Sequence, residues 1–184
     1  MTFFTPIVPA LLSTLVALQP MPQKPADPSP ATPGNGEQMM ALFDGISAKD
    51  SGWAGEGTYR RLLNTGAVEE TAFEVKSAFK RGWATHSWDA NTNLDWSNGT
   101  STQDQVTFLV QGDRLLLQTT AGQEPVTVVS ATPTDLTYRY FRSYQGYIYV
   151  YTHHLTLGET DLTVHSTLEL STGLLLEEQQ WTAH

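Results

Sequence analysis

The chain has 184 residues, which leaves room for one domain of ordinary size. Its 19 acidic and 10 basic residues give a net charge of −9, which argues against a nucleic-acid partner because phosphate binding needs a basic surface. The absence of cysteine excludes disulfide scaffolds, thiolate zinc sites, iron–sulfur clusters and thiol nucleophiles.

The N-terminal residues 1–18 form an apolar leader without a charged residue. The run over residues 3–18 is shorter than the roughly 20 residues of a membrane-spanning helix, and Pro6 and Pro9 disfavour a helix within it. We interpret the leader as a signal peptide or anchor and expect no integral membrane domain. This predicts an extracytoplasmic protein: periplasmic, secreted or at the cell surface.

Residues 19–36 contain six of the ten prolines of the chain. Frequent proline removes backbone donors and favours an extended chain, so this segment is predicted to be a disordered linker. Lys24 and Asp27 are its charged residues, and their charges cancel. The net charge of −9 therefore belongs to residues 37–184, which we interpret as the folded domain.

The folded domain is predicted to start with a short helix over residues 37–46, where apolar residues recur at helical spacing. After it, alternating apolar and polar residues are interrupted by frequent turn residues, which is typical of an all-β barrel or sandwich. The candidate strands cover residues 53–63, 71–81, 83–90, 104–111, 114–120, 125–132, 135–144, 147–157, 160–170 and 174–183. Because most loops between them are short, the predicted fold is an antiparallel up-and-down barrel of about ten strands.

A two-residue turn at residues 145–146 sorts the tyrosines onto one face of the sheet. It pairs Tyr140 with Tyr151 and Tyr138 with His153, and the reverse face carries mainly threonine and charged residues. Buried phenols need hydrogen-bond partners, which water or a ligand in a cavity supplies. We therefore predict a ligand-binding interior lined by Tyr138, Tyr140, Tyr149, Tyr151 and His153, with Arg142, Tyr144 and Tyr147 near its mouth.

A second predicted turn, at Arg81-Gly82, adds His86 and Trp88 to this ligand-binding interior. A slip of one residue in this hairpin would turn Trp83 inward instead. A further turn is predicted at residues 91–93, where asparagine is frequent.

The polar interior has two other interpretations, and the sequence leaves all three open. Aromatic residues have a high strand propensity and can fill a small barrel as a packed core. The tyrosines can also form an exposed aromatic patch that binds a partner.

The sequence shows no residue set typical of a catalytic or metal site, and a non-catalytic protein is the interpretation that we favour. His153 and His154 are neighbours on a strand and point to opposite faces, so they cannot bind one ion together. The same argument separates Glu177 from Glu178 as an acid/base pair. No serine elbow, phosphate loop or dinucleotide-binding fingerprint is present.

The first predicted strand carries the motif Gly52-Trp53-Ala54-Gly55-Glu56-Gly57-Thr58-Tyr59. A short helix, this motif and a run of antiparallel strands together resemble the calycin-type barrels, which include the lipocalins and fatty-acid-binding proteins. The Trp-x-Gly-x-Gly pattern is also similar to that of the nitrobindin-type haem barrels. The helical pair that lids the fatty-acid-binding proteins is missing here. The resemblance implies a barrel that binds a small apolar or amphipathic molecule, with Trp53 in a structural role.

Three hypotheses for the function follow. The first is an exported non-catalytic protein that binds a small hydrophobic or amphipathic molecule in its interior, without a cofactor. The second is a haem-binding barrel in which His153 or His86 ligates the iron. The third is a structural or partner-binding domain whose interior is solid. Nothing in the sequence indicates an oligomeric state.

Overall fold

The computed structural model describes residues 34–119 and 122–184, which form one α-helix and ten β-strands. In chain order these are α1 (Asn35–Ser47), β1 (Trp53–Leu62), β2 (Val68–Arg81), β3 (Ser87–Trp96), β4 (Ser101–Gln111), β5 (Arg114–Thr119), β6 (Gly122–Ala131), β7 (Asp135–Tyr144), β8 (Tyr147–Leu157), β9 (Leu162–Leu170) and β10 (Leu175–Ala183). The predicted leader and the predicted linker up to residue 33 lie outside the described residues. In the described part of the chain, no helix has the length and apolar character needed to cross a membrane.

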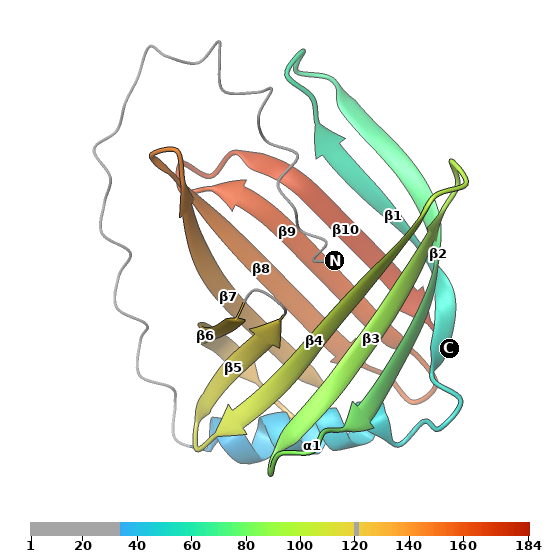
Figure 1. The fold of residues 1–184 in the computed structure, drawn as a ribbon, viewed down its shortest axis with the longest axis vertical. Helices are drawn as coiled ribbons and strands as arrows, with labels where there is room; N and C mark the ends of the chain where they lie inside the picture. The colour runs from blue at the N-terminus through green and yellow to red at the C-terminus, as the bar shows by residue number, and fades with distance from the viewer. Residues whose placement is uncertain (1–33, 120–121) are drawn as a thin grey trace.

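The strands form one closed antiparallel barrel (Figure 1). Each strand pairs with its neighbours in sequence, and β1 also pairs with β10, which closes the sheet. Closure satisfies the backbone groups that an open sheet would leave at its edges. The predicted fold class, an all-β antiparallel up-and-down barrel of about ten strands with one short helix, is confirmed.

The hairpin of β7 and β8 has the predicted register. Gln145 and Gly146 have φ angles of 50° and 83°, the conformation that a tight hairpin turn needs to match the twist of its strands. The turn places Tyr140 opposite Tyr151, as predicted from the sequence, and the pairing continues in register along both strands. The alternation of side chains therefore puts the predicted tyrosines on one face.

The third strand differs from the prediction of a strand over residues 83–90 and a turn at residues 91–93. β3 runs through the expected turn and pairs with both β2 and β4 there. Asparagine favours turns because its side chain can bond to the local backbone. On β3, however, Asn91 accepts a hydrogen bond of 2.9 Å from the side chain of Gln103 on β4, so the strand continues.

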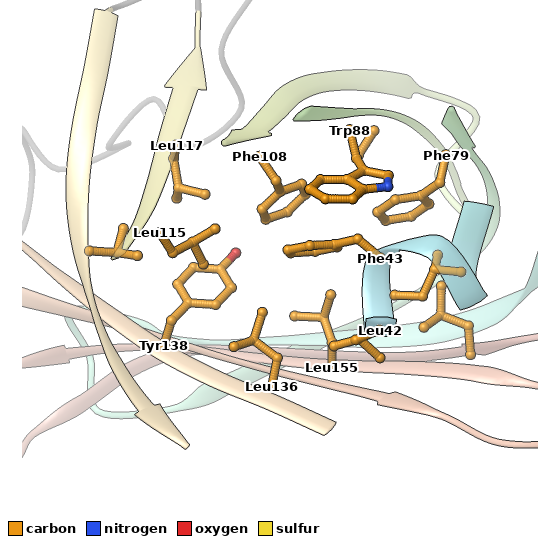
Figure 2. Packing of buried hydrophobic residues seen from close by; sticks show 14 of the residues in the cluster. Leu42, Phe43, Phe79, Trp88, Phe108, Leu115, Leu117, Leu136, Tyr138 and Leu155 are labelled. Carbon is orange, nitrogen blue, oxygen red and sulfur yellow. The ribbon is translucent and has the colours of Figure 1, made fainter. Parts of the chain in front are cut away.

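The helix α1 lies across one end of the barrel and closes it (Figure 1). Its buried face has the i, i+3, i+4, i+7 spacing of an amphipathic helix and consists of Met39, Leu42, Phe43 and Ile46. Figure 2 shows Phe43 among aromatic rings of the barrel wall, with its centroid 5.2 Å from that of Trp88 and 4.8 Å from that of Phe108. The end of the barrel is thus filled by a packed apolar cluster.

Polar contacts hold α1 in this position. The indole nitrogen of Trp53, at the start of β1, donates a hydrogen bond of 3.0 Å to the carbonyl of Ile46. The indole of Trp88 donates to the carboxylate of Asp44, also at 3.0 Å, and Arg81 forms an ion pair with the same carboxylate. Trp53 is 5% exposed, so its position agrees with the structural role that the family resemblance implies.

Glycine is required at Gly55 and Gly57, where β1 packs closely against its neighbours. A Cβ atom at Gly57 would lie 2.6 Å from both the ring of Phe73 and the Cβ of Trp181, and one at Gly55 would overlap the backbone of Thr182. Side chains at these two positions would force the strands apart. The glycines of the sequence motif therefore make the closing contact between β1 and β10 possible.

Candidate functional site

The interior of the barrel has two halves along its axis. The closed half, next to α1, is lined by Phe43, Phe79, Trp88, Phe108, Leu115, Leu136 and Leu155, each 7% exposed or less. The open half, toward the opposite loops, is lined by Tyr59, Trp96, Asp104, Val106, Glu124, Tyr140, Arg142, Tyr149, Tyr151 and Glu177. Side chains alternate between the two faces of a strand, and each of these residues shares the face of buried residues on its own strand.

Some inward side chains of the open half are not completely buried. Thr92, Trp96 and Val106 face the interior, yet each keeps part of its surface exposed. The inward residues nearer α1 on the same strands, such as Trp88 and Phe108, are buried. Because these side chains point into a closed barrel, their exposed surface faces accessible space inside it or at its mouth.

A polar wall on β6, β7 and β8 forms one side of the open half. Tyr140 and Tyr151 stack with ring centroids 4.7 Å apart and an interplanar angle of 4°. The guanidinium of Arg142 lies 5.5 Å from the centroid of Tyr140 and 5.7 Å from that of Tyr151. It also donates two hydrogen bonds, of 2.8 and 3.2 Å, to one carboxylate oxygen of Glu124. The two hydrogen bonds and the neighbouring rings fix the position of Arg142.

A second set of polar side chains lies on β1, β2 and β10, across the barrel from the polar wall. Arg61 forms an ion pair of 2.6 Å with Glu69 at the mouth. Deeper in the open half, burial raises the pKa of Tyr59, and the nearby carboxylate of Glu177 raises it further. Burial also raises the pKa of Glu177, against the opposing effects of Tyr59 and Arg61. The ring of Tyr59 packs edge-on against Trp96, at 5.6 Å between centroids.

Asp104 is an inward carboxyl group on β4. Among the described residues it takes part in none of the ion pairs. Burial raises the pKa of Asp104, and a hydrogen bond from the backbone N–H of Gln105 opposes this effect. The charge of Asp104 in turn contributes to the raised pKa of Tyr138 and Tyr140, so the three residues share the interior.

His153 lies between the two halves and has the contacts of a hydrogen-bonded core residue. Its ring stacks on Tyr138 and Tyr140, at 4.9 and 5.6 Å between centroids, and its Nδ1 lies 2.8 Å from the hydroxyl of Ser166. Burial lowers the pKa of His153 to about 4, so the imidazole is neutral at pH 7. A recess of about 10 Å³ beside it has the size of roughly one water molecule.

Most of the predicted site residues face the interior. Tyr138, Tyr140, Tyr149, Tyr151 and His153 are 5–8% exposed. Arg142 and Tyr147 are half-buried near the mouth, as expected. Tyr144 shares their face at the rim and is 43% exposed.

The prediction that His86 faces the interior is wrong, whereas Trp88 faces the interior as predicted but lies in the closed half. The connection between β2 and β3 is a loop of residues 82–86 rather than a two-residue turn. His86 lies in this loop with a φ angle of 58° and is exposed at the closed end of the barrel. Trp88 is fully buried, but its hydrogen bond to Asp44 makes it part of the closed half.

Three interior residues were not predicted from the sequence: Asp104, Glu124 and Glu177. Asp104 lies two residues before Val106 and four before Phe108, on the same face of the predicted strand. Alternation alone therefore predicts that it faces the interior. Glu124 lies just before the predicted start of its strand, and β6 begins earlier than predicted. Glu177 follows a register shift after Leu175, which no sequence pattern indicates.

The outer face carries a pair of histidines. His154 and His165 lie opposite each other on β8 and β9. The Nε2 of His165 is 2.9 Å from a carboxylate oxygen of Glu178, and that of His154 is 3.6 Å from one of Asp135. Over residues 34–119 and 122–184, no three histidine or acidic side chains are grouped in a way that could hold a metal ion.

Comparisons with known proteins give limited similarity. No protein-family model matches the sequence, and no curated protein matches it either. Among solved structures, the chain is similar to Rv2717c from M. tuberculosis, with 13% identity, a TM-score of 0.46 and coverage of 76% of this chain and 96% of that chain. It is also similar to a candidate thioesterase II from Thermobifida fusca YX, with 12% identity, a TM-score of 0.21 and coverage of 84% and 88%.

Proposed function

We propose that this chain is a non-catalytic binding protein that holds a small amphipathic molecule in the open half of its barrel. The observation that carries the proposal is the division of the interior, in which a packed closed half adjoins an open half with partly exposed inward side chains. A few polar groups on an otherwise apolar and aromatic wall are typical of small-molecule pockets. An interior that served stability alone would gain nothing from buried charges, because their desolvation is costly.

The lining of the open half suits a molecule with an apolar body and a polar group. Trp96 and Val106 are partly exposed and offer apolar surface, while Asp104 and Arg142 offer charged groups. The arrangement corresponds to the calycin-like mode of binding, with the ligand entering at the end opposite to α1. The apolar leader and the proline-rich linker support action outside the cytoplasm, at the cell surface, in the periplasm or after secretion.

A titration with the neutral fluorescent probe N-phenyl-1-naphthylamine tests the proposal. We expect saturable binding by the full chain and its loss in Val106→Trp, because an indole at this inward position fills the open half. The matched control is Gln105→Trp on the same strand, since Gln105 faces outward and is exposed. Circular dichroism verifies that both variants fold. Absent or non-saturable binding by the folded wild type would favour a solid structural domain.

Native mass spectrometry of the purified chain gives a second test. We expect a small molecule of defined mass to remain bound and to be released on denaturation. The same molecule should be absent from Val106→Trp and present in Gln105→Trp. Its presence in equal amounts on both variants would place the binding site outside the barrel.

Adding haem and recording a visible spectrum separates the proposal from the haem-binding hypothesis. We expect no Soret shift, because the imidazole of His153 is stacked on two tyrosines and bonded to Ser166. A Soret shift that His153→Ala abolishes would replace the proposal by a haem-binding barrel.

A further inference from the structure

The two ends of the barrel differ in the charge of their connections. Among the described turns at the end opposite to α1 (Figure 1), none contains a charged residue; they cover residues 63–67, 97–100, 145–146 and 171–174. The connections at the closed end carry Lys49, Asp50, Asp113, Glu159 and Asp161. In a chain with a net charge of −9, the open end therefore has uncharged turns on an acidic protein.

Exposed apolar side chains lie at the same end. Val68 at the start of β2 is 55% exposed, Tyr144 at the end of β7 is 43% exposed, and Leu174 and Leu175, where β10 begins, are 44% and 42% exposed. The strands from β7 through β8, β9, β10 and β1 to β2 are consecutive around the barrel. These four side chains, which we call the apolar rim, therefore border one arc of the mouth, and such a grouping marks an interaction surface.

The charged side chains next to the apolar rim already have partners. Arg61 and Glu69 form an ion pair of 2.6 Å between β1 and β2, and Arg142 forms one of 2.8 Å between β7 and β6. Glu177 is half-buried and takes part in a hydrogen bond with Tyr59. Contact of the apolar rim with an apolar medium would therefore leave these charges with the partners that they have.

A lipid membrane fits this end of the barrel better than a second protein surface does. Tyrosine is enriched at membrane–water interfaces, and leucine favours the hydrocarbon beyond them. A second copy docked mouth to mouth would close the entrance that the proposed function requires. Anionic headgroups would repel a chain with a net charge of −9, so the matching surface has headgroups without net charge.

We propose that the open end of the barrel docks onto a lipid surface with zwitterionic headgroups and inserts the apolar rim among them. The mouth then faces the hydrocarbon, so an amphipathic molecule can pass between the bilayer and the interior without crossing water. The closed end, with its charged connections, faces the solution. The docking stands on the apolar rim and the uncharged turns, whereas the passage of a ligand rests on the proposed function.

The absence of cysteine allows a fluorescent label to be placed at one chosen position of the full chain. Thr172→Cys in the turn between β9 and β10 carries the environment-sensitive dye NBD, and Thr85→Cys at the closed end is the matched control, since both threonines are exposed. Phosphatidylcholine vesicles should raise and blue-shift the emission of the label at residue 172 and leave the label at residue 85 unchanged. Phosphatidylglycerol vesicles at low ionic strength should give a smaller change at residue 172.

Two substitutions in the chain labelled at residue 172 test the apolar rim. Leu174→Asp should weaken binding to phosphatidylcholine vesicles by about tenfold, because a carboxylate at the rim must be dehydrated. The control is Trp83→Asp, which changes a side chain that is 92% exposed at the closed end and should keep wild-type binding. Circular dichroism establishes that both variants are folded. Binding of N-phenyl-1-naphthylamine without vesicles should be kept in Leu174→Asp.

The outcomes separate the docking from the proposed function. Unchanged emission at residue 172, or an equal change at both labels, would overturn the docking even where the chain binds the vesicles through another segment. Unweakened vesicle binding by Leu174→Asp would also overturn it. A change at residue 172 that appears with rising protein concentration and no vesicles would identify a second copy as the occupant instead. Docking by a chain that does not bind the probe in solution would overturn the proposed function alone.

Discussion

The two halves of the interior are built by the same ten strands and meet different requirements. In the closed half, Phe43, Trp88 and Phe108 pack ring against ring, and the indole nitrogen of Trp88 has a carboxylate partner on α1. In the open half, Asp104 and Glu177 are partly desolvated without an ion pair among the described residues. The difference indicates that the closed half supplies most of the stability. Under the proposed function, the open half gives up some stability to keep charged groups for a ligand.

The largest effect is expected from a cavity in the closed half. Phe43→Ala should lower the free energy of unfolding by about 3–5 kcal/mol, because it removes a fully buried ring that touches Trp88 and Phe108. Val106→Ala in the open half should cost about 1 kcal/mol, since its side chain is already partly exposed. Urea unfolding of both variants measures the contrast. Equal losses would contradict the division into two halves.

The pH dependence of the free energy of unfolding tests the burial of His153, which lies between the two halves. The pKa of His153 is about 4 in the folded protein and about 6.5 in an unfolded chain, so between these values the unfolded state binds a proton that the folded state does not. Stability should therefore fall by up to roughly 3 kcal/mol as the pH is lowered from about 6.5 to about 4.

His153→Gln should flatten this pH dependence, because glutamine carries no titrating group and can still bond to Ser166. His154→Gln on the outer face is the matched control and should keep the wild-type slope. Urea unfolding at half-unit pH steps measures all three proteins. A wild-type slope in His153→Gln would show that another group carries the dependence.

The polar wall of the open half is expected to have a smaller effect. Arg142→Leu should cost about 1–2 kcal/mol, because it leaves Glu124 partly buried without its partner, a value that allows for the partial exposure of both side chains. The double variant with Glu124→Leu should recover most of this loss. A double-mutant cycle by urea unfolding measures the coupling, with Arg60→Leu on the exposed face as the control. A coupling near zero would mean that Arg142 is not held by Glu124.

The smallest effect should have the opposite sign. Asp104→Asn should raise the free energy of unfolding at pH 7 by about 0.5–1 kcal/mol, because it removes a desolvated charge. The gain should shrink toward pH 4, where the raised pKa of Asp104 lets the wild-type carboxyl group take up a proton in the folded protein. Asp95→Asn is the control and should lose stability, since Asp95 accepts a hydrogen bond from Ser101 on the outer face. Destabilisation by Asp104→Asn would contradict the trade-off between the halves.

The tyrosine wall could be predicted from the sequence because its turn determines its register. Gln145 and Gly146 leave one way to pair β7 with β8, and alternation then assigns every side chain to a face. The same reasoning was wrong between β2 and β3, where Gly82 opens a loop instead of a tight turn and places His86 outside. A glycine indicates that the chain turns, but the length of the turn depends on contacts made by both strands.

The division of the interior could not be predicted from local patterns. Amphipathic spacing predicts the helix, but its place at the barrel end depends on distant contacts such as the bond from the indole of Trp53 to Ile46. The interior charges likewise depend on partners from other strands, as Arg142 on β7 meets Glu124 on β6. Which carboxylates stay outside ion pairs becomes visible only when all ten strands are in register.

The contact between β1 and β10 has a consequence for how the chain folds. It joins Gly55 to Ala183, near the two ends of the described domain, whereas the other described strand pairs join neighbours in sequence and can form as separate hairpins. A contact of such high sequence separation must wait until the sheet has curled, so we expect it to form last and to limit the folding rate. Until then both strands offer free edges to other chains, and the nascent domain is most prone to aggregate at this seam.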